Sequence, residues 1–349
     1  MKTLLSGNEA IAQGALDAGC NFYAGYPITP QNELIAYMAK QMGKGRYQKN
    51  VFIQAESELA AISMVYGAAA AGARAMTSSS SPGISLMQEG ISYLAGARLP
   101  ALIVNIMRGG PGLGNIAPAQ ADYFQAVRGG GHGDYHLIVL APASVQEAYN
   151  LSRQAFDLAD KYRVPVMVLG DGLLGQMMEP VKLSVKKNKP ALPKRWALTG
   201  CRGRKPNIVK SFFMHEGELE QANLKLQQNY RIIKRSCARF EGLFLSDARV
   251  IVVAYGTMAR IAKGAVGKLR AAGKKIGLLR PISLWPFPRQ PFSIKNDKVK
   301  YLVVEMSYGQ LLDDVRLAAA SCSTVEFLGR SGGGIPSEEQ IIQRIKRMF

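Results

Sequence analysis

The alternation of short apolar runs with helical segments constrains this fold more than any other feature of the sequence. The first part of the chain has apolar runs of strand length at residues 20–24, 51–54, 75–78, 101–107, 137–140 and 166–169. Most of the segments between them have apolar residues at helical spacing. Strands that alternate with helices form a mostly parallel sheet that is covered on both faces. The sequence therefore predicts a doubly wound α/β domain.

A second α/β unit follows a stretch of different composition. Residues 182–206 are basic and contain prolines, and residues 216–239 are typical of one long amphipathic helix. Apolar runs that alternate with helical segments then resume, at residues 250–254, 275–279, 301–305 and 324–328. We therefore expect an α/β domain over 1–181, a basic linker and helix over 182–246, and a second mostly parallel α/β domain over 247–349.

The net charge bears on the kind of partner. The 349 residues include 44 Lys and Arg against 25 Asp and Glu, which gives a net charge of +19. Such a chain suggests nucleic acid, but much of the excess lies in residues 186–239 and no nucleic-acid module is recognisable elsewhere. We therefore expect no nucleic-acid partner. The excess positive charge could serve to bind an acidic protein or an anionic substrate. Ordinary solvated surface charge without a specific partner is the commoner case.

Two further observations bear on the compartment. No uninterrupted apolar run has the length of a membrane span, and the first residues lack the pattern of a signal peptide, so we expect a cytoplasmic protein without a membrane partner. The cysteines are widely scattered and form no CxxC pair: Cys20, Cys201, Cys237 and Cys322. This spacing indicates free thiols, and it argues against a zinc site or an iron–sulfur cluster carried by this chain alone.

A proline-containing turn follows the first predicted strand. Its sequence is Gly-Tyr-Pro-Ile-Thr-Pro at residues 25–30, and the two prolines force the strand to end there. Open α/β sheets bind their ligands beyond the carboxyl ends of the strands. The hydroxyl of Thr29 therefore lies on a fixed turn at a place where a ligand is expected.

A carboxylate stands at the start of an unusually small and apolar segment. Glu58 directly precedes residues 59–73, which are rich in Ala and Gly. A carboxylate that enters a tightly packed region is costly unless the protein uses it. On the residues alone, an exposed carboxylate at a helix start, favoured by the macrodipole, is the commoner case. Glu56 is a competitor that the spacing does not exclude.

An arginine stands at the end of the most apolar predicted strand. Arg108 follows the run at 101–107 and precedes Gly109 and Gly110, so its guanidinium is expected in a crevice with bare backbone beside it. The forked cation suits a carboxylate ligand. An internal ion pair with an Asp or Glu is the alternative.

Several longer motifs extend these features. They read AESE at 55–58, MVYGA at 64–68, MTSSSSPGISLMQE at 76–89, MRGGPG at 107–112 and QADY at 120–123. With these motifs, almost the whole chain resembles the subunit of 2-oxoacid:ferredoxin oxidoreductases that contains the thiamine-diphosphate pyrimidine-binding domain. The branched-chain type, which acts on 2-oxoisovalerate, is the most similar. The second domain then resembles the C-terminal domain of transketolases.

The resemblance implies roles for particular residues. Glu58 becomes the catalytic carboxylate that hydrogen-bonds the aminopyrimidine ring of thiamine diphosphate, and Thr29 and Arg108 bind the 2-oxoacid. A carboxyl group whose pKa is raised by burial suits this proton-sharing role. The implied cofactor-binding residues are Tyr26, Pro27, Ile28, Glu58, Ser81, Pro82 and Gly83.

The resemblance also implies a reaction and partners. The reaction is the oxidative decarboxylation of a branched-chain 2-oxoacid with coenzyme A, which gives an acyl-CoA, CO₂ and reduced ferredoxin. Thiamine diphosphate is shared with a partner subunit that holds its diphosphate and Mg²⁺, and the iron–sulfur clusters belong to another subunit. A further small subunit completes the hetero-oligomer. The alternatives are a 2-oxoglutarate enzyme, a non-catalytic scaffold subunit and a non-oxidative thiamine enzyme.

Three weaker features complete the sequence analysis. Gly-Asp-Gly at 170–172 looks like the start of a diphosphate–Mg²⁺ signature, but the paired Asn that would complete the metal's ligands is missing downstream, so we expect no metal site. His132 lies in a glycine-rich loop. It could act as a general acid or be an ordinary polar loop residue, and the sequence leaves both roles possible. Gly256, Thr257 and Arg260 form a weak candidate for an anion-binding helix start.

Overall fold

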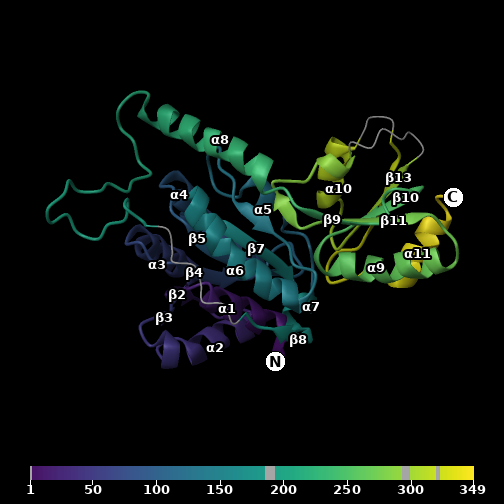
Figure 1. Cartoon of the computed structure of the whole chain (residues 1–349), viewed down its shortest axis with the longest axis horizontal. Coiled ribbons are helices and arrows are strands. Elements are labelled where there is room, and N and C mark those ends of the chain that lie inside the picture. The colour runs from purple at the N-terminus through teal and green to yellow at the C-terminus, as the bar shows by residue number, and fades with distance from the viewer. Residues whose placement is uncertain (1, 185–192, 293–298, 320–322) are drawn as a thin grey trace.

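The structure is a computed structural model. It describes residues 2–184, 193–292, 299–319 and 323–349 (Figure 1). The described chain forms two large sheets and a two-stranded ribbon, with helices packed around the large sheets, and a long helix, α8 (Glu218–Ser236), crosses above the first sheet. In these ranges no helix has both the length and the apolar character that a membrane span requires.

The first sheet is mostly parallel. Within the described ranges it has seven strands in the order β12-β6-β7-β5-β4-β2-β3, and all pairs run parallel except that of β12 with β6. Their bounds are β2 Phe22–Gly25, β3 Val51–Gln54, β4 Ala75–Ser79, β5 Ala101–Met107, β6 Ile138–Leu140, β7 Val166–Asp171 and β12 Ser283–Trp285. Successive parallel strands require crossover helices, as the alternation in the sequence predicts.

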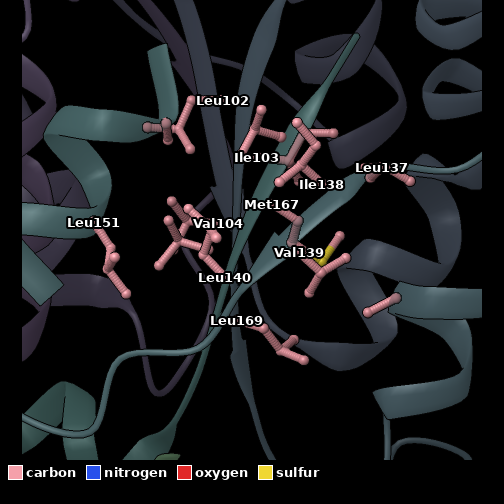
Figure 2. Close-up of a cluster of buried hydrophobic side chains, with 14 of the residues drawn as sticks. Leu102, Ile103, Val104, Leu137, Ile138, Val139, Leu140, Leu151, Met167 and Leu169 are labelled. Carbon is pink, nitrogen blue, oxygen red and sulfur yellow. The ribbon is translucent and has the colours of Figure 1, made fainter. Parts of the chain in front are cut away.

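Two groups of helices cover this sheet. One group packs around α1, which contacts α6 and α2, and the other pairs α3 with α4. Their bounds are α1 Gly7–Asp17, α2 Asn32–Gln41, α3 Glu58–Ala70, α4 Ser81–Gly96, α5 Tyr123–Arg128, α6 Val145–Tyr162 and α7 Gly172–Gln176. The central strand β5 is buried at every residue because both faces of the sheet are covered. Figure 2 shows its side chains packed with those of β6, β7 and Leu151 of α6.

The second sheet has the same character. Its order, among the described residues, is β14-β13-β10-β11-β9, and only β9 runs antiparallel to its neighbour. The strands are β9 Phe240–Leu243, β10 Val250–Val253, β11 Ile276–Pro281, β13 Lys300–Glu305 and β14 Val325–Gly329, and the helices are α9 Gly256–Ala271, α10 Gln310–Ala318 and α11 Glu338–Lys346. Ser337 and Gln340 form a capping box at α11, and their spacing of three residues is the sequence signature of that motif. Two mostly parallel sheets confirm the predicted fold class.

The structure departs from the sequence prediction at several boundaries. The helical spacing of apolar residues in the sequence indicates a start at 85 for one helix, but α4 begins at Ser81, because Pro82 is tolerated in the first turn. The spacing likewise indicates a helix from Arg260, but α9 begins at Gly256. Elements that the sequence did not indicate are the ribbon of β1 (Lys2–Ser6) with β8 (Met178–Lys182), the 3₁₀ turns Gly45–Tyr47 and Gln290–Phe292, and α5, α7, β9 and β12.

Two elements connect the sheets across the expected domain limits. Strand β9 lies within residues 182–246 but pairs with β11 of the second sheet. Strand β12 lies within residues 247–349 but pairs with β6 of the first sheet. An aromatic cluster fixes β12 there: the ring of His136 stacks on that of Trp285 at 4.4 Å, and both meet Tyr230 of α8 edge-on. The two lobes are therefore interlocked.

Candidate active site

Three neighbouring strands deliver the candidate residues to one edge of the first sheet. Strands β2, β4 and β5 are adjacent and parallel, so their carboxyl ends lie together. The turn at 26–30 follows β2, the first turn of α4 follows β4, and Arg108 follows β5. Ligands of open α/β sheets bind beyond such ends. The topology thus gathers the motifs that the sequence analysis selected.

Glu58 is a buried carboxylate. It is the first residue of α3, capped by Ser57, and its exposed fraction is 5%. The hydroxyl of Ser79, at the end of β4, donates to Glu58 Oε1 at 3.2 Å. Glu56, which the spacing could not exclude, is exposed. A carboxylate can accept about four hydrogen bonds. Glu58 therefore keeps acceptor capacity for the donors of a ligand.

Gly83 allows α4 to approach this carboxylate. A Cβ atom placed on Gly83 would collide with Ser79 Oγ and with Glu58 Oε1 and its carboxyl carbon. Glycine is the residue that permits such a close backbone approach. The first turn of α4 therefore lies directly against the Glu58 carboxylate, and the predicted residues Glu58 and Gly83 belong to one site.

Arg108 is buried and has no acidic partner among the described residues. Its exposed fraction is 7%, its Nη1 donates to the carbonyl of Thr29 at 2.9 Å, and its Nη2 donates to the carbonyl of Leu113 at 3.1 Å. Its Nε is buried without a partner in the described chain. The guanidinium is therefore held in place by neutral acceptors, and one of its donors is free for a ligand such as a carboxylate.

The turn at 26–30 lies at the rim of the site. Thr29 is half-buried; its carbonyl holds Arg108 and its hydroxyl accepts a hydrogen bond from Asn32 Nδ2 at 3.2 Å. Ile28 is half-buried, whereas Tyr26 and Pro27 are exposed. The structure thus connects Thr29 to Arg108 directly, and leaves Tyr26 and Pro27 facing outward.

Of the remaining candidates, Ser81 and Pro82 lie at the site, whereas His132 lies away from it. The hydroxyl of Ser81 accepts a hydrogen bond from the backbone N–H of Arg108 at 3.0 Å, so Ser81 joins the two strand ends. Pro82 occupies the first turn beside it. His132 is exposed, and its carbonyl accepts from Ser92, which lies eleven residues beyond Ser81 on α4. That separation is about 16 Å along a helix, so His132 is not brought to these residues.

Sequence reasoning missed two polar residues behind the site. Asn105 is fully buried within β5, and Asp122 precedes α5. The two side chains are joined, because Asn105 Nδ2 donates to Asp122 Oδ2 at 2.9 Å. Burial raises the pKa of the Asp122 carboxyl. An Asn inside an otherwise apolar strand was a signal that could have found this pair.

Asp171, from the rejected Gly-Asp-Gly motif, connects the two lobes. Its Oδ1 accepts from the backbone N–H groups of Leu173 and Leu174 at 3.0 and 3.1 Å and from Thr257 Oγ1 at 2.9 Å. Its side chain is 1% exposed, and burial raises its pKa. Arg260 pairs with Glu179. Thr257 and Arg260 therefore serve contacts between lobes, and no cluster of potential metal ligands occurs in the described ranges.

Comparison with known proteins agrees with this geometry. Residues 13–233 match the family model described as "Pyruvate flavodoxin/ferredoxin oxidoreductase, thiamine diP-bdg", and residues 248–341 match "Pyruvate:ferredoxin oxidoreductase core domain II". The fold is shared with a split-gene transketolase in its inactive tetramer, at a TM-score of 0.59 and 13% identity over 98% of this chain and 97% of that one. The family match over residues 13–233 thus places the chain in the thiamine-diphosphate-binding class.

More similar proteins narrow this class. Ketoisovalerate oxidoreductase subunit VorB of Methanothermobacter marburgensis is 48% identical over 99% of this chain and 97% of that protein. 2-Oxoglutarate synthase subunit KorA of Methanothermobacter thermautotrophicus is 37% identical over 99% of this chain and 98% of that protein. The structure of 2-oxoglutarate:ferredoxin oxidoreductase from Magnetococcus marinus, with 2-oxoglutarate, coenzyme A and succinyl-CoA bound, has a TM-score of 0.87 at 28% identity, over 99% of this chain and 65% of that one. The chain belongs to the 2-oxoacid:ferredoxin oxidoreductase family and is a subunit of an oxidoreductase complex.

Proposed function

We propose that this chain binds the aminopyrimidine end of thiamine diphosphate and the 2-oxoacid substrate in a branched-chain 2-oxoacid:ferredoxin oxidoreductase. The complex would convert 2-oxoisovalerate and coenzyme A into an acyl-CoA and CO₂, and pass the electrons to ferredoxin. One observation supports this above all others: a buried carboxylate, Glu58, with free acceptor capacity, lies against Gly83 at the same strand ends as Arg108.

The residues present fit the cofactor. Glu58 is a buried carboxylate that accepts a hydrogen bond from Ser79, so it can accept another from a ring nitrogen that carries a proton. When bound, thiamine diphosphate supplies the electron sink that carbon–carbon cleavage of a 2-oxoacid requires. In this proposal Glu58 holds or releases a proton at a ring nitrogen, and the turns formed by Tyr26, Pro27, Ile28, Ser81, Pro82 and Gly83 enclose the ring.

Arg108 and Thr29 would hold the substrate. The unpartnered Nε of Arg108 points to a ligand with acceptor atoms, and a 2-oxoacid carboxylate has them. The carbonyl groups of Thr29 and Leu113 keep the guanidinium oriented without neutralising its charge. Arg108 therefore fixes the carboxylate, and with it the carbon that is lost as CO₂, in one place relative to Glu58.

The partners follow from what this chain does not supply in our proposal. A partner subunit would hold the diphosphate and Mg²⁺, another subunit would carry the iron–sulfur clusters, and a further small subunit would complete the complex. Cys20, Cys201 and Cys237 are free thiols, which supports a reducing, cytoplasmic setting. We propose the division into 1–181, 182–246 and 247–349; the second family match begins at 248, which supports the last limit, whereas the first match runs across residue 181 to 233.

The substrate is tested with the purified complex and a panel of 2-oxoacids. We expect kcat/KM for ferredoxin reduction to be at least about ten-fold higher with 2-oxoisovalerate than with 2-oxoglutarate or pyruvate, since small differences in side-chain fit are worth that much. The higher identity to VorB than to KorA supports this order. A preference for 2-oxoglutarate would establish the alternative substrate. No turnover with any 2-oxoacid, with coenzyme A and ferredoxin present, would favour a scaffold subunit.

The basic arm, defined as residues 193–217, is proposed to face an acidic surface of a partner subunit. Between 193 and 215 the sequence has no Asp or Glu, and its cations are Lys194, Arg195, Arg202, Arg204, Lys205 and Lys210. Ile208, Phe212 and Met214 are exposed by 79%, 75% and 82%. Exposed apolar side chains amid charge of one sign are typical of a protein interface. A second copy of this chain is not the expected partner, because its basic arm would bring like charges together.

A zero-length carbodiimide cross-linker tests the arm in the intact complex, because it joins lysine amines to carboxylates in contact. We expect Lys205 to be joined to an Asp or Glu of a different subunit, whereas Lys210 already contacts Glu218 of this chain at 3.2 Å and should be joined to it. We also expect Arg202→Glu with Arg204→Glu and Lys205→Glu to weaken retention of that subunit at about 0.15 M salt, where surface charges still interact over short distances. The matched control reverses three exposed cations of the second lobe, Lys274, Lys275 and Lys346. Cross-links only to a second copy of this chain, or retention of every subunit, would contradict the proposal.

A further inference from the structure

A half-buried carboxyl that the proposed function does not use lies beside the Arg108 turn. Asp122 Oδ2 accepts hydrogen bonds from Ser81 Oγ at 2.6 Å and from Asn105 Nδ2 at 2.9 Å. Asn105 Oδ1 in turn accepts from the backbone N–H of Ser81 at 3.2 Å. The three residues come from the start of α4, from β5 and from the segment before α5. They form a closed set of contacts at the strand ends.

The hydroxyl of Ser81 transmits this arrangement to Arg108. A hydroxyl has one proton to donate, and the contact with Asp122 is shorter than the 3.3 Å to the carbonyl of Arg108. With its proton directed to Asp122, the oxygen presents its lone pairs to the backbone N–H of Arg108 at 3.0 Å. Without Asp122, that proton would be free to turn toward other acceptors, and the acceptor for Arg108 would lose its fixed direction.

We propose that Asp122 is a positioning residue for the 2-oxoacid: it orients Ser81, which holds the backbone of Arg108, which binds the substrate carboxylate. This inference rests on the proposed role of Arg108. It assigns Asp122 to substrate affinity rather than to proton transfer, because its contacts run to Ser81 and Asn105 and through them to the Arg108 backbone. Asp122 is therefore distinct from Glu58, which lies against Gly83.

The test measures KM and kcat separately in the purified complex. We expect Asp122→Ala to raise KM for 2-oxoisovalerate about ten-fold, the effect of losing one charge-assisted hydrogen bond, while kcat stays within about two-fold. Asp122→Asn should restore KM, since its amide oxygen accepts from the same two donors. Tyr123→Phe is the matched control: it removes the hydrogen bond from Tyr123 Oη to Asp314 but touches neither Ser81 nor Asn105, and KM should not change.

A second readout does not depend on turnover. Hydrogen–deuterium exchange at the Arg108 amide should be faster in Asp122→Ala than in the wild type and unchanged in Tyr123→Phe. A purely structural role would instead raise exchange throughout β5 or lower the amount of assembled complex. Ser81→Ala should raise KM by a similar factor, and the double variant with Asp122→Ala should add little, because both changes act through the same contact. If Asp122→Ala does not assemble, Ser81→Ala carries the test.

Several outcomes would overturn the inference. They are a wild-type KM in Asp122→Ala, a loss of kcat with unchanged KM, unchanged exchange at Arg108, and additive effects of the Ser81 and Asp122 variants. These outcomes are observed in a complex that turns over 2-oxoacids, so they count against the arrangement of Asp122, Ser81 and Arg108 and not against the oxidoreductase activity. A wild-type complex that turns over no 2-oxoacid would count against the proposed function instead.

Discussion

Glu58→Gln is expected to lower kcat of the complex by about 10²–10⁴-fold, the usual contribution of a positioned acid–base group. The amide introduced by this substitution would have nearly the shape of the carboxyl, and its oxygen could still accept from Ser79. It cannot share a proton with a ring nitrogen. Folding and assembly should therefore survive while turnover is lost. The measurement is ferredoxin reduction at saturating 2-oxoisovalerate and coenzyme A, together with size-exclusion chromatography of the complex.

Glu56→Gln provides the matched control. Glu56 is two residues away and carries the same group, but it is exposed. Its conversion to Gln removes the same charge, so any effect of net charge on assembly would appear in both variants. We expect near wild-type kcat for Glu56→Gln. Near wild-type activity in Glu58→Gln would show that the catalytic assignment of Glu58 is wrong, and a large loss in Glu56→Gln instead would transfer the role.

Asp171→Ala is expected to destabilise the protein by about 2–4 kcal/mol, because it leaves several buried donors without an acceptor. A single oxygen, Oδ1, accepts from Leu173, Leu174 and Thr257. The first two contacts cap α7 of the first lobe, and the third comes from the first turn of α9 in the second. The loss should appear as a melting temperature lowered by several degrees, measured on the assembled complex.

The control for this variant is Asp171→Asn. An amide oxygen at the Oδ1 position can accept from the same three donors, so we expect a much smaller fall in melting temperature than for Asp171→Ala. If both variants melted like the wild type, Asp171 would not be a link between the lobes. If instead both variants kept their melting temperature but lost activity that added Mg²⁺ restored, the Gly-Asp-Gly motif would be a metal-binding site after all.

The sequence allowed the strand ends, and the candidate residues that follow them, to be predicted, because both depend on local signals. Apolar runs that end in prolines or glycines, at residues 27–30 and 109–110, mark where a strand must stop. The choice between Glu56 and Glu58 needed the structure. Both lie at the start of the same helix, and only packing against Ser79 and Gly83 shows which one is buried.

Features that depend on distant parts of the chain escaped prediction. Asp122 reads as a polar residue near a loop until β5 and α4 converge on it, since its partners lie 17 and 41 residues away. Strand β12 is only three residues long, and nothing in its local sequence indicates that its neighbour is β6. Short strands and shared hydrogen bonds are specified by tertiary contacts, whereas the sequence patterns used here are local.

The antiparallel pairing of β12 with β6 has a consequence for biosynthesis. Its residues are made more than a hundred positions after those of β6, so a ribosome must add the basic arm, α8 and the first part of the second lobe before the edge of β6 can be covered. Until then β6 presents unpaired backbone groups, the kind of edge to which other strands bind. A chain that is truncated near residue 247 should therefore be poorly soluble and prone to aggregate, and should not fold as an independent cofactor-binding domain.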